Sequence, residues 1–298
     1  MELNKIRKDF KQRYEKDCED IFFAGLPVIF FGGQGEFVSV CLSLGECLAF
    51  SKRDDGRITM QFSENDRRIS FNIDDLLKNK KEQIAKDIIN LNKVGIQAFG
   101  GDFFLYKNSV ITNLSELLLM GTFLMNGKNV PNRETVLAQF DNFTDNVAAL
   151  SGKKGFFSVY SGQRMTFLPF FSNVKIVLSM LNKKTVIKKH PENSMVQETL
   201  LAIRRRDPEK FGELLDNNTK KIIDENSVGE LAHLFDVARS NKDSYGNGIL
   251  SEGGIYSVVC EDKIDTFIHN VSAKYQKFYG GVPDFYVTEP VDSGVFLG

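Results

Sequence analysis

The stretch SLGECLAFSKRDDGRITMQFSEN, Ser43 to Asn65, decides the fold class of this chain. It completes an apolar, strand-like run that begins near Phe37 and then reaches Arg-Asp-Asp-Gly at residues 53–56, a pattern typical of a hairpin turn. Apolar and polar residues alternate after this turn, at 58–62 and again at 69–73. The first part of the chain therefore predicts an antiparallel sheet.

Helical and strand-like segments follow one another along the rest of the chain. The spacing of Leu3, Ile6, Phe10 and Tyr14 predicts a first helix that ends near Lys16. Further helices are expected at 81–98, 114–125, 133–150 and 263–278, with several helices between 193 and 239. Further strands are expected at 102–106, 156–160, 165–168, 174–180, 255–260 and 284–287. This order indicates an α+β fold. We expect two domains, 1–170 with a mixed or antiparallel sheet and helices, and 171–298 with an α+β arrangement.

Composition and charge exclude several classes of protein. The chain has 298 residues, of which 42% are hydrophobic, and a net charge of -1. A balance so close to neutral argues against a nucleic-acid or anionic-membrane partner. Its four cysteines and three histidines lack metal-ligand spacing, so no metal site is expected. The charged N-terminus and the absence of a long apolar run predict a cytoplasmic protein without a membrane span.

One glycine pair resembles part of a phosphate-binding loop. Gly253 and Gly254 lie in ILSEGGIYSVVCED, Ile249 to Asp262, between a polar run and an apolar strand pattern. Glycines at such a place let backbone N–H groups approach an anion closely. Glu252, immediately before them, would repel a triphosphate, and most glycine pairs are ordinary turns.

Three scaffold segments resemble galactokinase, within the GHMP family of small-molecule kinases. They are Ser43 to Asn65, DNVAALSGKKG (Asp145 to Gly155) and PDFYVTEPVDSG (Pro283 to Gly294), and the resemblance covers nearly the whole chain, from about Ile6 onward. It implies a two-domain GHMP-kinase-like fold with sugar and nucleotide in the cleft between the domains. It also implies phosphoryl transfer from Mg-ATP to the anomeric hydroxyl of a sugar such as galactose.

The first motif of that family resembles G-R-V-N-L-I-G-E-H-T-D-Y and corresponds here to FFAGLPVIFFGGQGEF, Phe22 to Phe37. The arginine that stabilises charge during transfer falls on Pro27. The sugar-binding glutamate falls on Gly33, the histidine on Gln34 and the sugar-binding aspartate on Glu36. The resemblance thus implies Gly33, Gln34 and Glu36 as the substrate-binding positions. Loss of one such electrostatic group costs on the order of 10²–10³ in rate.

The family's central phosphate loop resembles P-x-G-x-G-L-S-S-S-A, with glycines whose N–H groups converge on phosphate. The corresponding segment is YKNSVITNLSELLLMGTFLM, Tyr106 to Met125, which has no glycine before Gly121. Thr112 and Ser115 are the implied nucleotide-binding positions. The same residues fit an ordinary helix start, with Thr112 as N-cap, and this interpretation is favoured.

Two further positions match the family. Asp145 falls on the aspartate that the family places beside the reacting hydroxyl, with Gly152 seven residues later. Asp145 is therefore the implied catalytic residue of an active enzyme. The third motif, resembling G-A-G-F-G-G, keeps Gly253 and Gly254 as nucleotide-binding positions, whereas a further sugar-binding segment is replaced by KKHPEN at 188–193.

Three hypotheses follow from this pattern. The favoured one is a catalytically inactive pseudokinase that needs no cofactor and has a sugar- or ligand-binding, regulatory or assembly role. The second is an active ATP-dependent galactokinase or sugar kinase with a rearranged site and Mg-ATP as cofactor. The third is an interaction protein whose cleft is filled by its own aromatic side chains, among them Phe30, Phe31 and Phe37.

Overall fold

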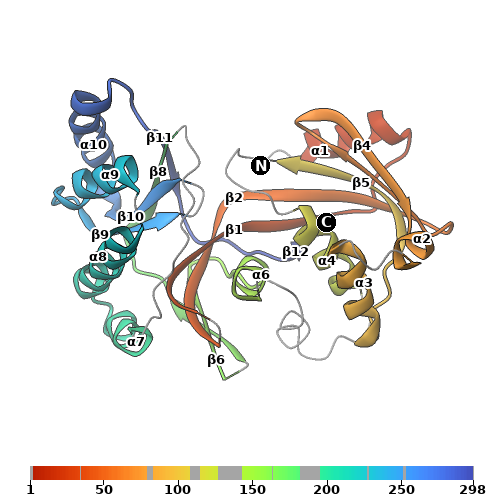
Figure 1. Ribbon diagram of the computed structural model, residues 1–298, viewed down its shortest axis with the longest axis horizontal. Coiled ribbons are helices and arrows are strands. Elements are labelled where there is room, and N and C mark those ends of the chain that lie inside the picture. Colours follow the sequence, from red (N-terminus) through yellow and green to blue (C-terminus); the bar gives the residue numbers. More distant parts are fainter. Residues whose placement is uncertain are drawn as a thin grey trace. The chain divides into compact units, whose positions relative to one another are not determined.

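The chain forms two compact units of mixed helices and strands, in a computed structural model that describes residues 3–33, 35–78, 83–107, 115–126, 143–162, 164–181, 195–226, 228–250 and 253–297 (Figure 1). Unit 1 takes the described residues of Met1–Pro27, Cys41–Gly152 and Val291–Gly298. Unit 2 takes those of Val28–Val40 and Lys153–Pro290. The α+β class is confirmed. The division into domains 1–170 and 171–298 stays a prediction. The two compact units are a different division, because each of them consists of segments that are not continuous in the sequence.

Unit 1 is built on a mixed sheet. Its strands are β1 (Asp20–Gly33), β2 (Glu36–Arg53), β3 (Arg57–Phe62), β4 (Asn65–Asn72), β5 (Gly100–Lys107) and β12 (Val295–Phe296). Of the two long strands, the first part of β1 and the last part of β2 belong to unit 1. Its helices are α1 (Leu3–Tyr14), α2 (Ile73–Lys78), α3 (Gln83–Lys93), α4 (Ser115–Asn126) and α6 (Phe143–Leu150). The strand order is β12-β1-β2-β5-β3-β4. The long apolar strands β2 and β5 lie inside the sheet, as their burial requires.

The hairpin predicted at residues 53–56 is wrong in its pairing. The chain does turn there, and the Asp55 carboxylate accepts hydrogen bonds from Arg53 Nε at 3.0 Å and from the backbone N–H of Arg57 at 3.1 Å. However, β5 lies between β2 and β3, antiparallel to the first and parallel to the second. Gly100 makes this insertion possible, because an added Cβ would lie 2.8 Å from the backbone N of Arg57. The true hairpin joins β3 to β4.

The predicted first helix is confirmed, and its apolar face builds part of the unit 1 core. Ile6 and Phe10 of α1 are fully buried in a cluster whose other buried members are Cys18, Ile21, Phe23, Cys47, Ala49 and Phe104. A carboxylate is buried nearby in β5: Asp102 is 3% exposed and binds Lys16 Nζ at 2.8 Å and Arg53 Nη1 at 3.3 Å. Two cations compensate the desolvation of this acid.

Unit 2 contains a small antiparallel sheet covered by helices. The strands of unit 2, besides the parts of β1 and β2 that it contains, are β6 (Phe156–Ser161), β7 (Arg164–Pro169), β8 (Val174–Met180), β9 (Ser244–Leu250), β10 (Gly254–Cys260) and β11 (Asp284–Thr288). Its helices are α7 (Val196–Arg205), α8 (Pro208–Glu225), α9 (Gly229–Arg239) and α10 (Ile264–Tyr279). The small sheet has the order β11-β8-β10-β9, whereas β6 pairs with the first residues of β2 and with β7.

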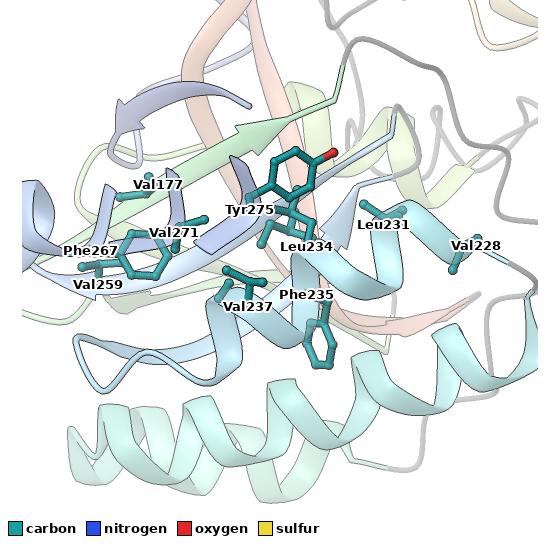
Figure 2. Close-up of a cluster of buried hydrophobic side chains, with 12 residues drawn as sticks. Val177, Val228, Leu231, Leu234, Phe235, Val237, Val259, Phe267, Val271 and Tyr275 are labelled. Carbon is teal, nitrogen blue, oxygen red and sulfur yellow. The ribbon is translucent and has the colours of Figure 1, made fainter. Parts of the chain in front are cut away.

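The core of unit 2 lies between this sheet and the helices α9 and α10. Figure 2 shows Phe267 and Val271 of α10 and Leu234 of α9 gathered near Val177 of β8 and Val259 of β10. The helix side chains come from apolar positions at helical spacing, and the strand side chains from alternate positions. These two periods made the helix at 263–278 and the strands at 174–180 and 255–260 predictable from the sequence. Burial of such a cluster is the main stabilising term of a unit this size.

The strand β9 was not predicted, because its sequence SYGNGIL contains two glycines. The structure shows why they are needed. An added Cβ on Gly246 would lie 2.4 Å from Cα of Gly212 in α8, and one on Gly248 would lie 1.9 Å from Cζ of Tyr256. The glycines thus let a helix and an aromatic ring approach the strand closely.

In the part of the chain that the structure describes, no helix is both long enough and apolar enough to cross a membrane.

Candidate functional site

The first candidate segment, Phe22 to Phe37, covers β1 from Phe22 to Gly33 and the first two residues of β2. Pro27 is a half-buried residue within β1, and no Lys, Arg or His occurs between Asp20 and Gly33. Phe30 and Phe31 are each 1% exposed and belong to unit 2. Their rings lie 5.2 Å and 5.6 Å from that of Phe211 in α8. These aromatic residues are core residues of their own unit.

The turn between β1 and β2 fixes the place of the implied sugar-binding residues. Gly32 has a φ of 106°, and an added Cβ would lie 2.2 Å from the carbonyl oxygen of Glu36, so only glycine fits. Gly33 ends β1, and Gln34 lies outside the described residues. The turn leaves Glu36 as the first residue of β2, paired with Ser161 of β6.

The Glu36 carboxylate is half-buried and has a partner that the sequence did not predict. Gln197 of α7 donates a hydrogen bond from Nε2 to Glu36 Oε1 at 3.1 Å. The two residues lie far apart in the sequence and both belong to unit 2, and no local pattern announces their contact. An amide donor beside a carboxylate acceptor is a pair that can recognise neighbouring hydroxyl groups.

The segment that corresponds to the phosphate loop is described only from Ser115, the first residue of α4; Thr112 lies outside the described residues. The helix is apolar and largely buried, as predicted: Leu118, Leu119, Phe123 and Leu124 are inside, whereas Met125 is 37% exposed. Gly121 within it serves packing, because an added Cβ would lie 2.6 Å from Cε1 of Phe22 in β1. Here a glycine allows a helix to approach a strand.

Asp145 is an exposed residue in the first turn of α6. The other end of that helix is held by buried polar contacts within unit 1. Cys41 Sγ donates to the carbonyl oxygen of Ala148 at 2.8 Å, and Ser293 Oγ donates to that of Ala149. Ser293 Oγ also accepts from the backbone N–H of Gly25 at 2.7 Å.

The same junction explains why two scaffold segments of the galactokinase resemblance occur together. Gly152 follows α6, and an added Cβ there would lie 2.4 Å from Cβ of Cys41 and 2.8 Å from Cβ of Ser293. The small residues after Asp145 and before Gly294 therefore meet at one tightly packed point. These contacts hold the C-terminal end of α6, the helix whose first turn contains Asp145.

Gly253 and Gly254 close the hairpin between β9 and β10. Gly253 has a φ of 94°, donates its N–H to the carbonyl oxygen of Leu250 at 3.2 Å and accepts from Leu181 N–H at 3.1 Å. Gly254 is paired with Met180 on one side and with Leu250 on the other. The backbone of this pair is thus occupied by sheet and turn hydrogen bonds, which is the ordinary use of such glycines.

We expect Gly254→Ala to lower the free energy of unfolding by about 1–3 kcal/mol. The added Cβ would lie 2.8 Å from the carbonyl oxygen of Ser179, a backbone atom, and 2.4 Å from Sδ of Met180. Gly281→Ala is the matched control, because an added Cβ there meets nothing within 4 Å. Urea denaturation followed by far-UV circular dichroism measures both; equal stabilities would contradict the packing role of Gly254.

The described candidate residues are divided between the two units. Unit 1 holds Ser115 and Asp145, and unit 2 holds Gly33, Glu36, Gly253 and Gly254. Within unit 2, β2 brings Glu36 against α7, whereas Gly253 lies in the turn before β10 and Gly254 is the first residue of β10. Among the residues that the structure describes, no group of three or more His, Cys, Asp or Glu side chains is placed to hold a metal ion.

Comparison with solved structures supports the α+β fold that the sequence predicts. The chain is similar in structure to Lactococcus lactis galactokinase complexed with galactose, with a TM-score of 0.82 and 16% identity over 98% of this chain and 99% of that one. It is also similar to Methanococcus jannaschii mevalonate kinase, with a TM-score of 0.60 and 14% identity over 91% and 98% of the two chains. At these identities the likeness shows the fold.

The likeness in sequence is local. A galactokinase of Clostridium acetobutylicum is 28% identical over 106 residues, which are 34% of this chain and only 27% of that relative. No protein-family profile matches the chain. The relative's activity therefore does not pass to this chain on sequence alone.

Proposed function

We propose that this chain, which has the galactokinase fold, binds a sugar or a related polyhydroxylated ligand in the cytoplasm without transferring phosphate, and acts as a sensor, regulator or assembly subunit. The observation that supports this most is the composition of β1. Pro27 occupies the position of the family's charge-stabilising arginine, and the whole strand lacks a cationic side chain.

Phosphoryl transfer depends on positioning and on neutralising the charge that spreads over the transferred group. A proline supplies neither a charge nor an N–H donor. Asp145 supplies a carboxylate in α6, but a negative group does not replace a missing cation. The sequence from Tyr106 to Met125 also lacks the early glycines whose amides would surround a phosphate. Each of these losses weakens the same transition state.

Support for sugar binding comes from Glu36. It keeps a carboxylate at the position of the family's sugar-binding aspartate, and Gln197 Nε2 lies 3.1 Å from it. The similar Lactococcus lactis galactokinase was solved with galactose, which makes that sugar the first ligand to test. Phe30, Phe31 and Phe37 are buried in unit 2, so they pack its core and offer no exposed aromatic platform.

The first test is a coupled assay for ADP release with galactose and Mg-ATP. We expect no turnover above the protein-free background, and the same result for Asp145→Asn. Turnover that disappears in the Asp145→Asn variant would overturn the proposal and establish the alternative, an active sugar kinase with Asp145 as its catalytic residue.

The second test is ligand-induced thermal stabilisation. A sugar present at 100 times its dissociation constant adds about 2.7 kcal/mol to the free energy of unfolding. We expect stabilisation by galactose or a related sugar in the wild-type chain, a weaker effect in Glu36→Gln and no effect of ATP. If no sugar stabilises the chain, the remaining hypothesis is an interaction protein without a small ligand.

A further inference from the structure

Polar side chains from three elements of unit 2 lie at the place where β2 begins. Glu36 of β2 accepts a hydrogen bond from Gln197 of α7, with 3.1 Å between Oε1 and Nε2. Ser161 of β6 is paired with Glu36, so these two side chains share one face of the sheet. Ser161 and Gln197 are exposed, and Glu36 is half-buried. A ligand can therefore reach these groups from solvent.

Packing holds the backbone of these three residues in place. Phe37, next to Glu36, is fully buried, and its ring stacks on that of Tyr160, next to Ser161, with 5.3 Å between the ring centroids. The helix α7 is held by a buried face that consists of Val196, Thr199, Leu200, Ala202 and Ile203. Polar groups on such rigid elements are already in position before a ligand binds, which lowers the entropy cost of binding.

The hydrogen bond between Glu36 and Gln197 uses only part of what the two side chains offer. A carboxylate has roughly four acceptor sites, and a primary amide has a pair of N–H donors and a carbonyl acceptor. Within the described residues neither side chain makes another hydrogen bond or an ion pair. The amide thus keeps an N–H donor beside a carboxylate that keeps most of its acceptor sites.

A pair of adjacent sugar hydroxyls is complementary to this arrangement, because each hydroxyl is both a donor and an acceptor. One hydroxyl can donate to the Glu36 carboxylate while its neighbour accepts from the Gln197 amide, and the two protein atoms are only 3.1 Å apart. A carboxylate alone binds donors and makes no demand on a second hydroxyl. The amide is what adds selectivity for the pair.

We propose that Gln197 contacts the ligand directly and makes the site select sugars with two adjacent hydroxyl groups, one bound by Glu36 and the other by Gln197. This inference rests on the proposed sugar-binding function and names the chemical pattern that the site recognises. A site that binds a hydroxyl through a polar side chain rejects an analogue without that hydroxyl, because the side chain then lacks its partner.

The first test measures galactose binding to the full-length chain by isothermal titration calorimetry. Gln197→Ala removes the amide and should weaken binding by roughly tenfold. Leu201→Ala is the matched control, because Leu201 lies one turn further along α7 and is 51% exposed, and it should bind like the wild type. Without ligand, both variants should have the urea midpoint of the wild type. Unchanged binding with a lowered midpoint in Gln197→Ala would make this residue purely structural and overturn the inference.

A panel of monodeoxygalactoses tests the selection itself. The wild type should bind the sugar that lacks the hydroxyl of Gln197 roughly tenfold more weakly than galactose, whereas Gln197→Ala should bind both alike. If both proteins discriminated equally against every deoxy sugar, the inference would be overturned. Binding that Glu36→Gln weakens and Gln197→Ala leaves unchanged would overturn the inference alone, and the proposed function would stand. Failure of every sugar in the panel to bind the wild type would overturn both.

Discussion

Gly212→Ala is expected to lower the free energy of unfolding by about 3 kcal/mol, although alanine favours a helix over glycine by about 1 kcal/mol. Gly212 lies inside α8 and faces β9. An added Cβ would lie 1.9 Å from the carbonyl oxygen of Tyr245 and 2.7 Å from the backbone N of Gly246. Both are backbone atoms of a strand held in a sheet, so neither can move aside cheaply. The steric cost exceeds the gain in propensity.

The matched control for this change is Gly229→Ala at the first position of α9, where an added Cβ meets nothing within 4 Å. We expect it to stay within about 0.5 kcal/mol of the wild type. The chain contains no Trp, so urea unfolding is best followed by far-UV circular dichroism. If both substitutions shifted the midpoint alike, close packing of α8 on β9 would not be the reason for Gly212.

Asp216→Ala is expected to cost about 3 kcal/mol for a different reason. Asp216 Oδ1 accepts hydrogen bonds from the backbone N–H of Asn247 at 2.7 Å and from Asn247 Nδ2 at 3.1 Å. Asn247 is 1% exposed, and its Oδ1 is already taken by the Ser257 hydroxyl at 2.7 Å. Alanine would leave the backbone N–H of buried Asn247 without this acceptor, and would leave Nδ2 with only its longer hydrogen bond to Ser244 Oγ at 3.4 Å. A buried donor without an acceptor carries a desolvation cost of about 1–3 kcal/mol.

Asp216→Asn separates hydrogen bonding from charge, because its Oδ1 can accept both bonds. We expect a much smaller loss than for alanine, and a loss that depends on pH. Burial raises the pKa of the Asp216 carboxyl above its ordinary value, against weaker lowering by hydrogen bonds from Asn247 and by Arg239. The folded chain therefore holds this proton more tightly than the unfolded chain does.

The sign of the pH effect follows from that difference. The contribution of Asp216 to stability is fully present below the ordinary pKa of an aspartate, about 3.9, and is lost as the pH rises through the raised folded value. The asparagine variant lacks this loss. Its stability relative to the wild type should improve as the pH increases from about 3 to 7, measured as urea midpoints. A constant difference across that range would show that Asp216 is not desolvated in the folded chain.

Much of the fold was predictable because its elements follow simple periods. The helical spacing of Leu3, Ile6 and Phe10 gave α1, and the apolar run at Val174–Met180 gave β8 with its observed bounds. The prediction failed where long-range geometry decides. The insertion of β5 between β2 and β3 could not be predicted from the sequence, because the turn after Arg53 has the composition of a hairpin turn.

The candidate site was predictable only where the resemblance supplied it. The resemblance to galactokinase identified Asp145 and Glu36, and the structure places them in α6 and at the start of β2. No periodicity predicts that Gln197 would contact Glu36, because a hydrogen bond between distant segments depends on how their elements pack. The glycines were identified as candidate anion binders, whereas Gly253 and Gly254 have a sufficient structural reason in the hairpin.

The route of the chain through its two units has a consequence for synthesis and for truncation. Unit 1 begins at the N-terminus, yet Ser293, which binds Gly25 and Ala149, and Phe296, which pairs with Phe22, belong to the segment that follows all of unit 2. During translation the earliest part of the protein must wait for these late residues before its sheet is complete. A premature stop after Pro290 would therefore remove Ser293 and Phe296 and leave unit 1 without these contacts.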